Sequence, residues 1–203
     1  MFEWSEEDQM VREAVRGFIE KEVRPHVDAL ETGEMPPYDI LRKMLAAFGM
    51  DSMNAENLQA EIAAEEAGEE RKAGGGSSTL ANSMFLILNM EMAGVSLGLI
   101  SSMGVSMGLT VSTIRSRGTL AQKKRWLPEL VTMEKVGAWA ITEPDSGSDA
   151  LGGMKTTVRR DGDDYILKGN KTFITNGPHA DTMVVFAKLD EGDGTPMRER
   201  KVL

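Results

Sequence analysis

Residues 92–114 contain no charged side chain, and this run limits most strongly how the chain can fold. As a helix it is long enough to cross roughly 30 Å of hydrocarbon, and its two GxxxG pairs are typical of closely approaching helices. However, seven of its 23 residues are Ser or Thr and four are Gly, and Glu91 precedes it directly. We therefore expect buried helices that meet at small residues, with no membrane span. A membrane-anchored helical protein is the alternative.

Helical patterns continue on both sides of this run. Ser5 is followed by three carboxylates, which predicts a capping box at the start of a first helix that ends at Arg24-Pro25. Thr119 can cap a later helix, in which Pro128 is expected to break or restart the helix. The stretch between the second helix and a Gly-rich loop is rich in Glu and Ala. It predicts a solvated helix with few contacts to the core. The expected ranges are 38–48 for the second helix, 55–72 for the solvated helix, 73–78 for the loop and 119–131 for the later helix.

The residue pattern changes from helical to strand-like after Val136. Short β-rich runs appear there, separated by Gly, Asn and Asp residues that favour hairpin turns. We therefore predict an α+β protein with an all-α helical domain at 1–134 and a partial antiparallel β-barrel or sheet at 135–203. The expected strands are 137–142, 156–160, 165–168, 172–175 and 182–189.

Composition excludes several classes of function. The net charge of −9 argues against a nucleic-acid partner, because most of the surface would repel a phosphate backbone. The absence of cysteine excludes disulfides and thiolate chemistry, and two distant histidines predict no metal site. The chain opens without a basic region followed by an apolar run, so we expect no secretory signal and a cytoplasmic location.

The stretch WAITEPDSGSD at 139–149 ends a strand-like run with many hydrogen-bonding groups. In one interpretation this is a turn in which Ser and Asp bond their own backbone. In the other, hydroxyls at Thr142 and Thr175 grip the edge of a flat heteroaromatic ring. Gly147-Ser148-Asp149 would then offer a close backbone approach to a pyrophosphate or similar anion. The residues alone leave both interpretations open.

Four stretches of the chain resemble the acyl-CoA dehydrogenases, the flavoenzymes that desaturate acyl-CoA thioesters. The two specific ones are AITEPDSGSD at 140–149 and KGNKTFITNG at 168–177, in that order and spacing. GTLAQKKRWLPEL at 118–130 looks like the family's segment before its middle domain, and residues 2–25 are similar to its first helix. The resemblance covers the chain apart from the region near 50–80, and it favours the second interpretation.

The resemblance implies roles for individual residues around an FAD cofactor. Thr142 would bond the pyrimidine edge of the flavin, Thr175 would lie near N5, and Phe173 would stand against the ring. Ser148 would meet both the cofactor and the CoA portion of the substrate, whereas Glu143 and Asp149 would fix the loop. The full set of implied cofactor-binding residues is Trp139, Ala140, Ile141, Thr142, Gly147, Ser148, Phe173, Ile174 and Thr175.

The family's catalytic base is a Glu on a third, C-terminal helical domain, and no residue here matches it. We therefore expect no catalytic residue in this chain and no activity from the chain alone. The resemblance implies acyl-CoA desaturation in fatty-acid or related catabolism, with an electron-transferring flavoprotein as partner and a homotetramer or homodimer for the full-length form. The alternative is a non-catalytic flavin- or acyl-CoA-binding subunit, or a truncated remnant.

Overall fold

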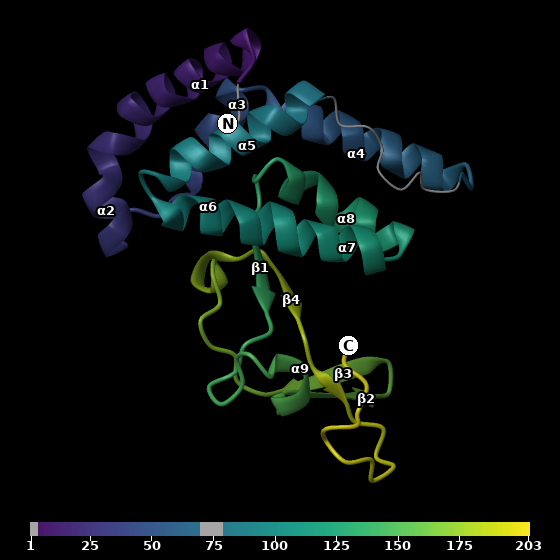
Figure 1. Cartoon of the computed structure of the whole chain (residues 1–203). Helices are drawn as coiled ribbons and strands as arrows, with labels where there is room; N and C mark the ends of the chain where they lie inside the picture. The colour runs from purple at the N-terminus through teal and green to yellow at the C-terminus, as the bar shows by residue number, and fades with distance from the viewer. Residues whose placement is uncertain (1–3, 70–78) are drawn as a thin grey trace. The chain divides into compact units, whose positions relative to one another are not determined.

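The computed structural model describes residues 4–69 and 79–203, and the loop expected at 73–78 lies outside them. The chain divides into two compact units, Met1–Lys135 and Val136–Leu203 (Figure 1). The first unit is helical and the second contains short strands, which confirms the predicted α+β class. Each unit has its own architecture.

The helices of the first unit follow one another with short connections. Two π-helical segments and one 3-10 turn continue neighbouring α-helices rather than standing alone. The elements are α1 (Glu6–Phe18), the π-helix Ile19–Val23, the 3-10 turn Arg24–His26, α2 (Val27–Thr32), α3 (Tyr38–Ala47), α4 (Met50–Glu66), α5 (Thr79–Ala93), α6 (Leu97–Met103), the π-helix Gly104–Thr110, α7 (Val111–Arg117) and α8 (Leu120–Val131).

Both predicted caps are present. The Asp8 amide donates to Ser5 Oγ at 3.1 Å, and the Ser5 amide donates to the Asp8 carboxylate at 3.2 Å. Thr119 makes the same reciprocal box at the start of α8. The prediction for Pro128 was wrong, because α8 runs through it to Val131. Leu127 on the same helix is fully buried, and such packing offsets the one backbone hydrogen bond that proline removes.

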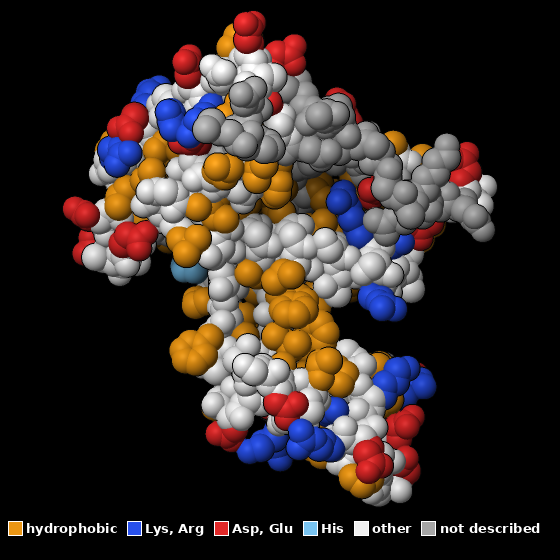
Figure 2. All heavy atoms as spheres, viewed as in Figure 1, with side chains coloured by type: hydrophobic (Ala, Val, Ile, Leu, Met, Phe, Trp, Pro, Cys, Tyr) orange, Lys and Arg blue, Asp and Glu red, His pale blue; other side chains and the backbone are white. Residues whose placement is uncertain are grey.

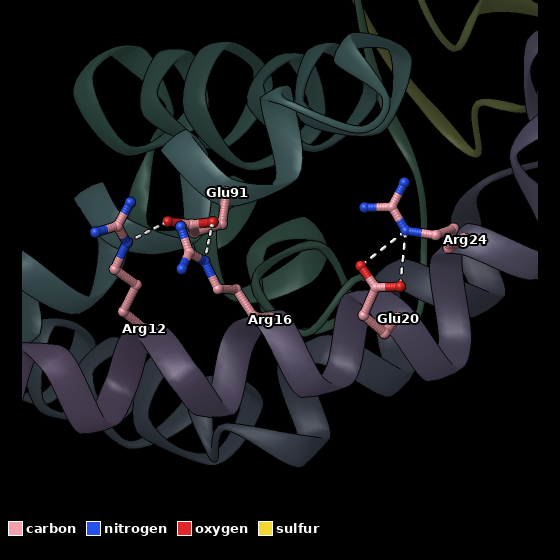
Figure 3. Close-up of polar contacts among 5 residues, drawn as sticks. All are labelled: Arg12, Arg16, Glu20, Arg24 and Glu91. Carbon is pink, nitrogen blue, oxygen red and sulfur yellow. Dashed lines mark hydrogen bonds and ion pairs between the residues drawn. The ribbon is translucent and has the colours of Figure 1, made fainter.

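An ion-pair cluster joins α1 to α5 (Figure 3). Glu91 on α5 accepts hydrogen bonds from Arg12 and Arg16 on α1, with an Arg16 Nε to Oε2 distance of 2.7 Å. Burial alone would raise the pKa of Glu91, but the two guanidinium groups outweigh it and lower the pKa. The carboxylate that borders the charge-free run therefore serves as a link between two helices.

The segment Leu97–Arg117 is a continuous helical rod. By length and composition alone it is able to cross a membrane, although 39% of its apolar window is buried inside the protein. Its buried residues recur every three or four positions, which is the pattern of a helix against a core. These residues are Leu99, Met103, Ser106, Thr110 and Ile114, with Val111 buried beside Thr110. Burial on one side favours the expected core helix, and the absence of a membrane span stays a prediction.

The solvated helix begins earlier than the predicted residue 55. Only Met50 and Leu58 of α4 are buried, as its low apolar content predicts. Ion pairs join its other positions to α7 and α8, among them Glu65 with Lys123 at 2.7 Å and Glu61 with Arg115 at 3.2 Å. Pairs of this exposure contribute little stability each, so α4 is a weakly held element.

The second unit contains two small sheets. One pairs β1 (Gly137–Ala140) with β4 (Thr182–Val185) in parallel, and Gly137 lies opposite Thr182. The other has the order β3-β2-β5, with β2 (Thr157–Asp161), β3 (Asp164–Lys168) and β5 (Lys188–Leu189). The expected hairpin between β2 and β3 is confirmed, with Gly162 at φ +65° in its turn. The remaining elements are the short helix α9 (Ala150–Gly153) and the 3-10 turn Gly177–His179.

Three details of the expected sheet were wrong. The sheets are partial, as predicted, but they mix parallel and antiparallel pairs and do not close into a barrel. The expected strand at 182–189 is split between the two sheets. The expected strand at 172–175 is irregular, because Phe173 has φ +55° and Asn176 has φ +67°, values that an extended strand does not adopt.

Several large apolar side chains of the second unit are exposed. Figure 2 shows hydrophobic side chains gathered around β1 and β4 on the viewed face. Strand β3 is exposed at every position, so its apolar residues pack against little. The exposed large apolar residues of this unit are Leu151, Tyr165, Ile166, Leu167, Phe173, Met183, Met197 and Leu203.

Candidate functional site

The two specific motif segments lie side by side in the second unit. The Thr172 amide donates to the Thr142 carbonyl at 3.0 Å. At the other end, Asn176 Nδ2 donates to the Gly137 carbonyl at 2.9 Å. These two bonds make the segment 172–176 run antiparallel to the segment 137–142. Thr172 is therefore the residue of the second segment that is bonded to Thr142.

A buried ion pair joins the same two segments. Lys171 Nζ lies 2.9 Å from Glu143 Oε1 and 3.0 Å from the Ile141 carbonyl oxygen. Only 11% of the lysine side chain and 5% of the glutamate side chain are exposed. A buried pair is stable only when its remaining donors and acceptors are satisfied, so the surroundings of Glu143 matter.

Glu143 is held by backbone donors as well as by Lys171. The Lys155 amide donates to Oε2 at 2.7 Å, and the Thr156 amide donates to Oε1 at 2.9 Å. Burial by itself would raise the pKa of Glu143, but hydrogen bonds from Thr156, Lys155 and Lys171 outweigh it and lower the pKa to about 2. Glu143 is thus a structural carboxylate that fixes the loop, because its oxygens are already bonded.

The loop that follows folds tightly on itself. Glu143 and Ser146 exchange backbone hydrogen bonds of 3.0 and 3.1 Å, and Ser146 Oγ donates to the Asp149 carbonyl at 2.7 Å. A Cβ at Gly152 would lie 2.2 Å from Asp149 Oδ1, so a larger residue here would displace the Asp149 side chain. For Ser146 and Asp149 the turn interpretation therefore describes the structure, while Ser148 is left exposed.

Several groups of the site have no partner within the protein. In the part of the chain that the structure describes, the hydroxyls of Thr142, Ser148 and Thr175 make no hydrogen bond. Phe173 is 92% exposed, although its left-handed backbone conformation is uncommon for a bulky residue. Open hydroxyls and an exposed aromatic ring within one unit are the groups that a planar ligand with polar edges and apolar faces would need.

The other expected site residues take different positions. Ala140 is fully buried, and its carbonyl accepts from the Phe186 amide at 3.0 Å. Trp139 packs edge-to-face on Phe186 with centroids 4.7 Å apart. Ile141 and Ile174 are half-buried, and Gly147 is exposed. The described residues contain no cluster that would hold a metal ion.

Sequence reasoning missed Lys171, Thr172 and Asn176. Their partners lie 28, 30 and 39 positions away, so no local pattern pointed to these contacts. The only available signal was that all three residues belong to the KGNKTFITNG stretch.

Comparison with known proteins gives two family-model matches. Residues 5–134 match "Acyl-CoA dehydrogenase, N-terminal domain", and residues 138–202 match "Acyl-CoA dehydrogenase, middle domain". A short-chain specific acyl-CoA dehydrogenase of Clostridium acetobutylicum is 32% identical over 194 residues, which is 96% of this chain and 46% of that protein. The chain thus spans about half the length of this curated relative.

Solved structures are similar in the same way. The crystal structure of glutaryl-CoA dehydrogenase from Mycobacterium smegmatis has a TM-score of 0.69 and 32% identity, over 93% of this chain and 44% of that one. An acyl-CoA dehydrogenase complexed with FAD from Bacillus anthracis has a TM-score of 0.64 and 32% identity, over 93% of this chain and 30% of that one.

Proposed function

The chain belongs to the acyl-CoA dehydrogenase family, and we propose that it forms the FAD-binding part of an enzyme that desaturates an acyl-CoA thioester between its α and β carbons. The observation that carries the proposal is the pairing of the segments 137–142 and 172–176, which carry the open hydroxyls of Thr142 and Thr175 and the exposed ring of Phe173. The similar structure from Bacillus anthracis is described as complexed with FAD, which supports the same cofactor here.

The residues of the site divide into binding and structural roles. Thr142 and Thr175 supply donors for the polar edge of the flavin, and Phe173 supplies an apolar face that keeps water away from the ring. Ser148, exposed on its loop, can meet both the cofactor and the CoA portion of the substrate. Trp139, Ile141, Gly147 and Ile174, none of which is fully buried, would complete the contact. When bound, FAD supplies the acceptor for the hydride that leaves the β-carbon.

Removal of the α-proton needs a base, and the loop carboxylates are already bonded. Glu143 binds Lys171 and two amides, Asp145 pairs with Lys155, and Asp149 pairs with Arg198. For Glu143 these bonds favour the charged form and occupy its oxygens, which makes it a poor general base. This supports the expectation that the chain alone does not catalyse the reaction. It also favours the alternative of a non-catalytic flavin- or acyl-CoA-binding subunit.

Further parts of the proposal rest on the family resemblance. The electron acceptor would be an electron-transferring flavoprotein, and the complete protein would be a homo-oligomer. A cytoplasmic location is proposed independently of the resemblance. Acyl-CoA thioesters are the substrate class.

FAD titration of the purified chain tests the proposal. We expect bound-flavin absorbance with the wild-type chain and about 10-fold weaker binding for Thr142→Val, which removes one hydrogen bond. Phe173→Ala should weaken binding by a similar factor, about 10-fold, through lost ring contact. Thr157→Val on β2 is the matched control and should bind like wild type. A wild-type chain that does not bind FAD, or a Thr142→Val chain equal to its control, contradicts the proposal.

Activity separates the proposed enzyme from its alternative. The chain alone should not reduce an electron-accepting dye with acyl-CoA. An enzyme part should gain activity when mixed with the C-terminal region of a relative, whereas a non-catalytic subunit should not.

A further inference from the structure

Lys171 grips the chain on both sides of Thr142. Its ammonium is 3.0 Å from the carbonyl of the preceding residue, Ile141, and 2.9 Å from the carboxylate of the following residue, Glu143. The next residue along, Thr172, donates its amide to the Thr142 carbonyl at 3.0 Å. Two consecutive residues of one segment therefore fix three consecutive residues of the other.

Thr142 itself keeps its donors open. Among residues 4–69 and 79–203, neither its amide nor its hydroxyl has a hydrogen-bond partner. Thr142 is half-buried, so its donors can be reached by a ligand or by water. Both open donors belong to the residue that the lysine immobilises, which suggests that they are held ready for a ligand.

The lysine also acts on the strength of one of these donors. The Ile141 carbonyl and the Thr142 amide are the two ends of one peptide group. A cation bonded to the carbonyl polarises that group and makes its N–H a stronger donor. Because the ammonium is largely buried, water screens its charge poorly. Glu143 keeps the ammonium at this position, since it is the one carboxylate bonded to it in the described structure.

We propose that Lys171 is a positioning residue for the flavin: its ammonium fixes the Ile141–Thr142 peptide and strengthens the Thr142 amide as a donor to the electron-rich edge of the ring. This inference rests on the proposed function, because it takes the ligand to be FAD. A strengthened donor stabilises the reduced, more negative ring, so Lys171 should make the reduction potential of bound flavin more positive.

The test uses the full 203-residue chain with two measurements. The first needs no cofactor and follows hydrogen exchange at the Thr172 amide. Lys171→Gln should speed this exchange about 10-fold or more, because it removes a buried charge-assisted contact. Lys171→Arg keeps the charge and should restore slow exchange. Lys155→Gln, which breaks the exposed pair with Asp145, is the matched control and should leave exchange unchanged.

The second measurement is the reduction potential of bound FAD. We expect a more negative potential for Lys171→Gln, with wild-type values for Lys171→Arg and Lys155→Gln. A merely structural lysine would loosen flavin binding without moving the potential of the flavin that remains bound. Lys171→Gln with wild-type exchange and wild-type potential overturns the proposal.

The outcomes separate this inference from the proposed function. A wild-type chain that binds no FAD but shows the expected exchange pattern contradicts the proposed function and leaves Lys171 as the residue that positions Thr142. A chain that binds FAD with a potential indifferent to Lys171 contradicts only the inference. If Lys171→Gln does not fold, nuclear magnetic resonance of the wild type decides. The Lys171 ammonium should be protected from solvent and near the Thr142 amide, and free exchange with solvent overturns the proposal.

Discussion

Large apolar side chains fill the interior of the helical unit, whereas the second unit buries mostly small ones and places charged groups among them. Leu41, Leu45 and Leu127 are fully buried in the first unit. In the second unit the corresponding residues include Ala138 and Ala140. Of the described residues, the buried charged ones, Glu143 and Lys188, both belong to the second unit.

The difference shows two ways of holding a chain in place. Apolar packing is non-directional, and it stabilises the helical unit in proportion to the area removed from water. Polar networks stabilise less but fix distances and directions, because hydrogen bonds depend on geometry. The Glu143–Lys171 network and the bonds from Lys188 Nζ to the carbonyls of Arg198 and Arg200 are of this second kind. The segments that carry the candidate site are therefore held in defined positions by directional hydrogen bonds.

The largest expected effect tests the apolar interior of the first unit. Leu41→Ala removes a fully buried side chain from α3 and should lower the free energy of unfolding by about 4 kcal/mol, through lost burial and the cavity left behind. Leu97→Ala is the matched control, because Leu97 is 65% exposed, and it should change stability by less than about 0.5 kcal/mol. Urea unfolding with peptide-resolved hydrogen exchange measures both. Equal effects of the two substitutions would show that burial of apolar side chains is not what stabilises the first unit.

The next effect tests the polar network of the second unit through pH. The pKa of Glu143 is about 2 in the folded chain and 4.5 for the free group, so its contribution to stability is fully present above pH 4.5. As the pH falls from 4.5 through 2, protonation removes that contribution, which amounts to about 3 kcal/mol. Exchange protection of the second unit, followed from pH 7 to 2, should decrease over this window.

Glu143→Gln supplies the comparison for the acid experiment. This chain should be less stable at pH 7 and should lose less of its remaining stability across the same window, because the titrating group is gone. Asp145→Asn, which removes an exposed carboxylate of the same loop, should keep the wild-type pH dependence. An unchanged acid transition in Glu143→Gln would show that other carboxylates control the second unit.

The same contrast explains what the sequence revealed. Apolar periodicity and capping residues are local signals, so the helices of the first unit and the boxes at Ser5 and Thr119 could be predicted. The hairpin turn at Gly162 was readable for the same reason. The irregular segment 172–175 was not. The left-handed conformation of Phe173 accompanies contacts with a segment about 30 positions earlier in the sequence, which no local pattern encodes.

The candidate site was only partly readable. The motif stretches indicated which segments matter, and the structure brings those segments together. Their alignment was not predictable, because the bond to Thr142 comes from a backbone amide, which every residue except proline carries. The roles of Lys171 and Asn176 likewise depend on the fold as a whole rather than on their neighbours in sequence.

The two smallest expected changes in stability have opposite signs, one in each unit. A Cβ at Gly169 would lie 2.1 Å from Thr156 Oγ1, and Thr156 is 2% exposed and cannot move away freely. Gly169→Ala should therefore destabilise the second unit by about 2 kcal/mol through overpacking. Gly17 lies inside α1 with no atom within 4 Å of its added Cβ, so Gly17→Ala should stabilise the first unit by about 0.7 kcal/mol.

Thermal unfolding with peptide-resolved exchange assigns each of these changes to its unit. The identical chemical change, one methyl group, then reports on the room available in each region. The helix surface has room for the methyl group, and the substitution raises stability because it makes the unfolded chain less flexible. The β2–β3 region rejects it because Thr156 also supplies an amide to Glu143, so any shift there disturbs the carboxylate. A Gly169→Ala chain as stable as wild type would show that Thr156 can move without loosening Glu143, and the second unit would be less precisely held than its contacts indicate.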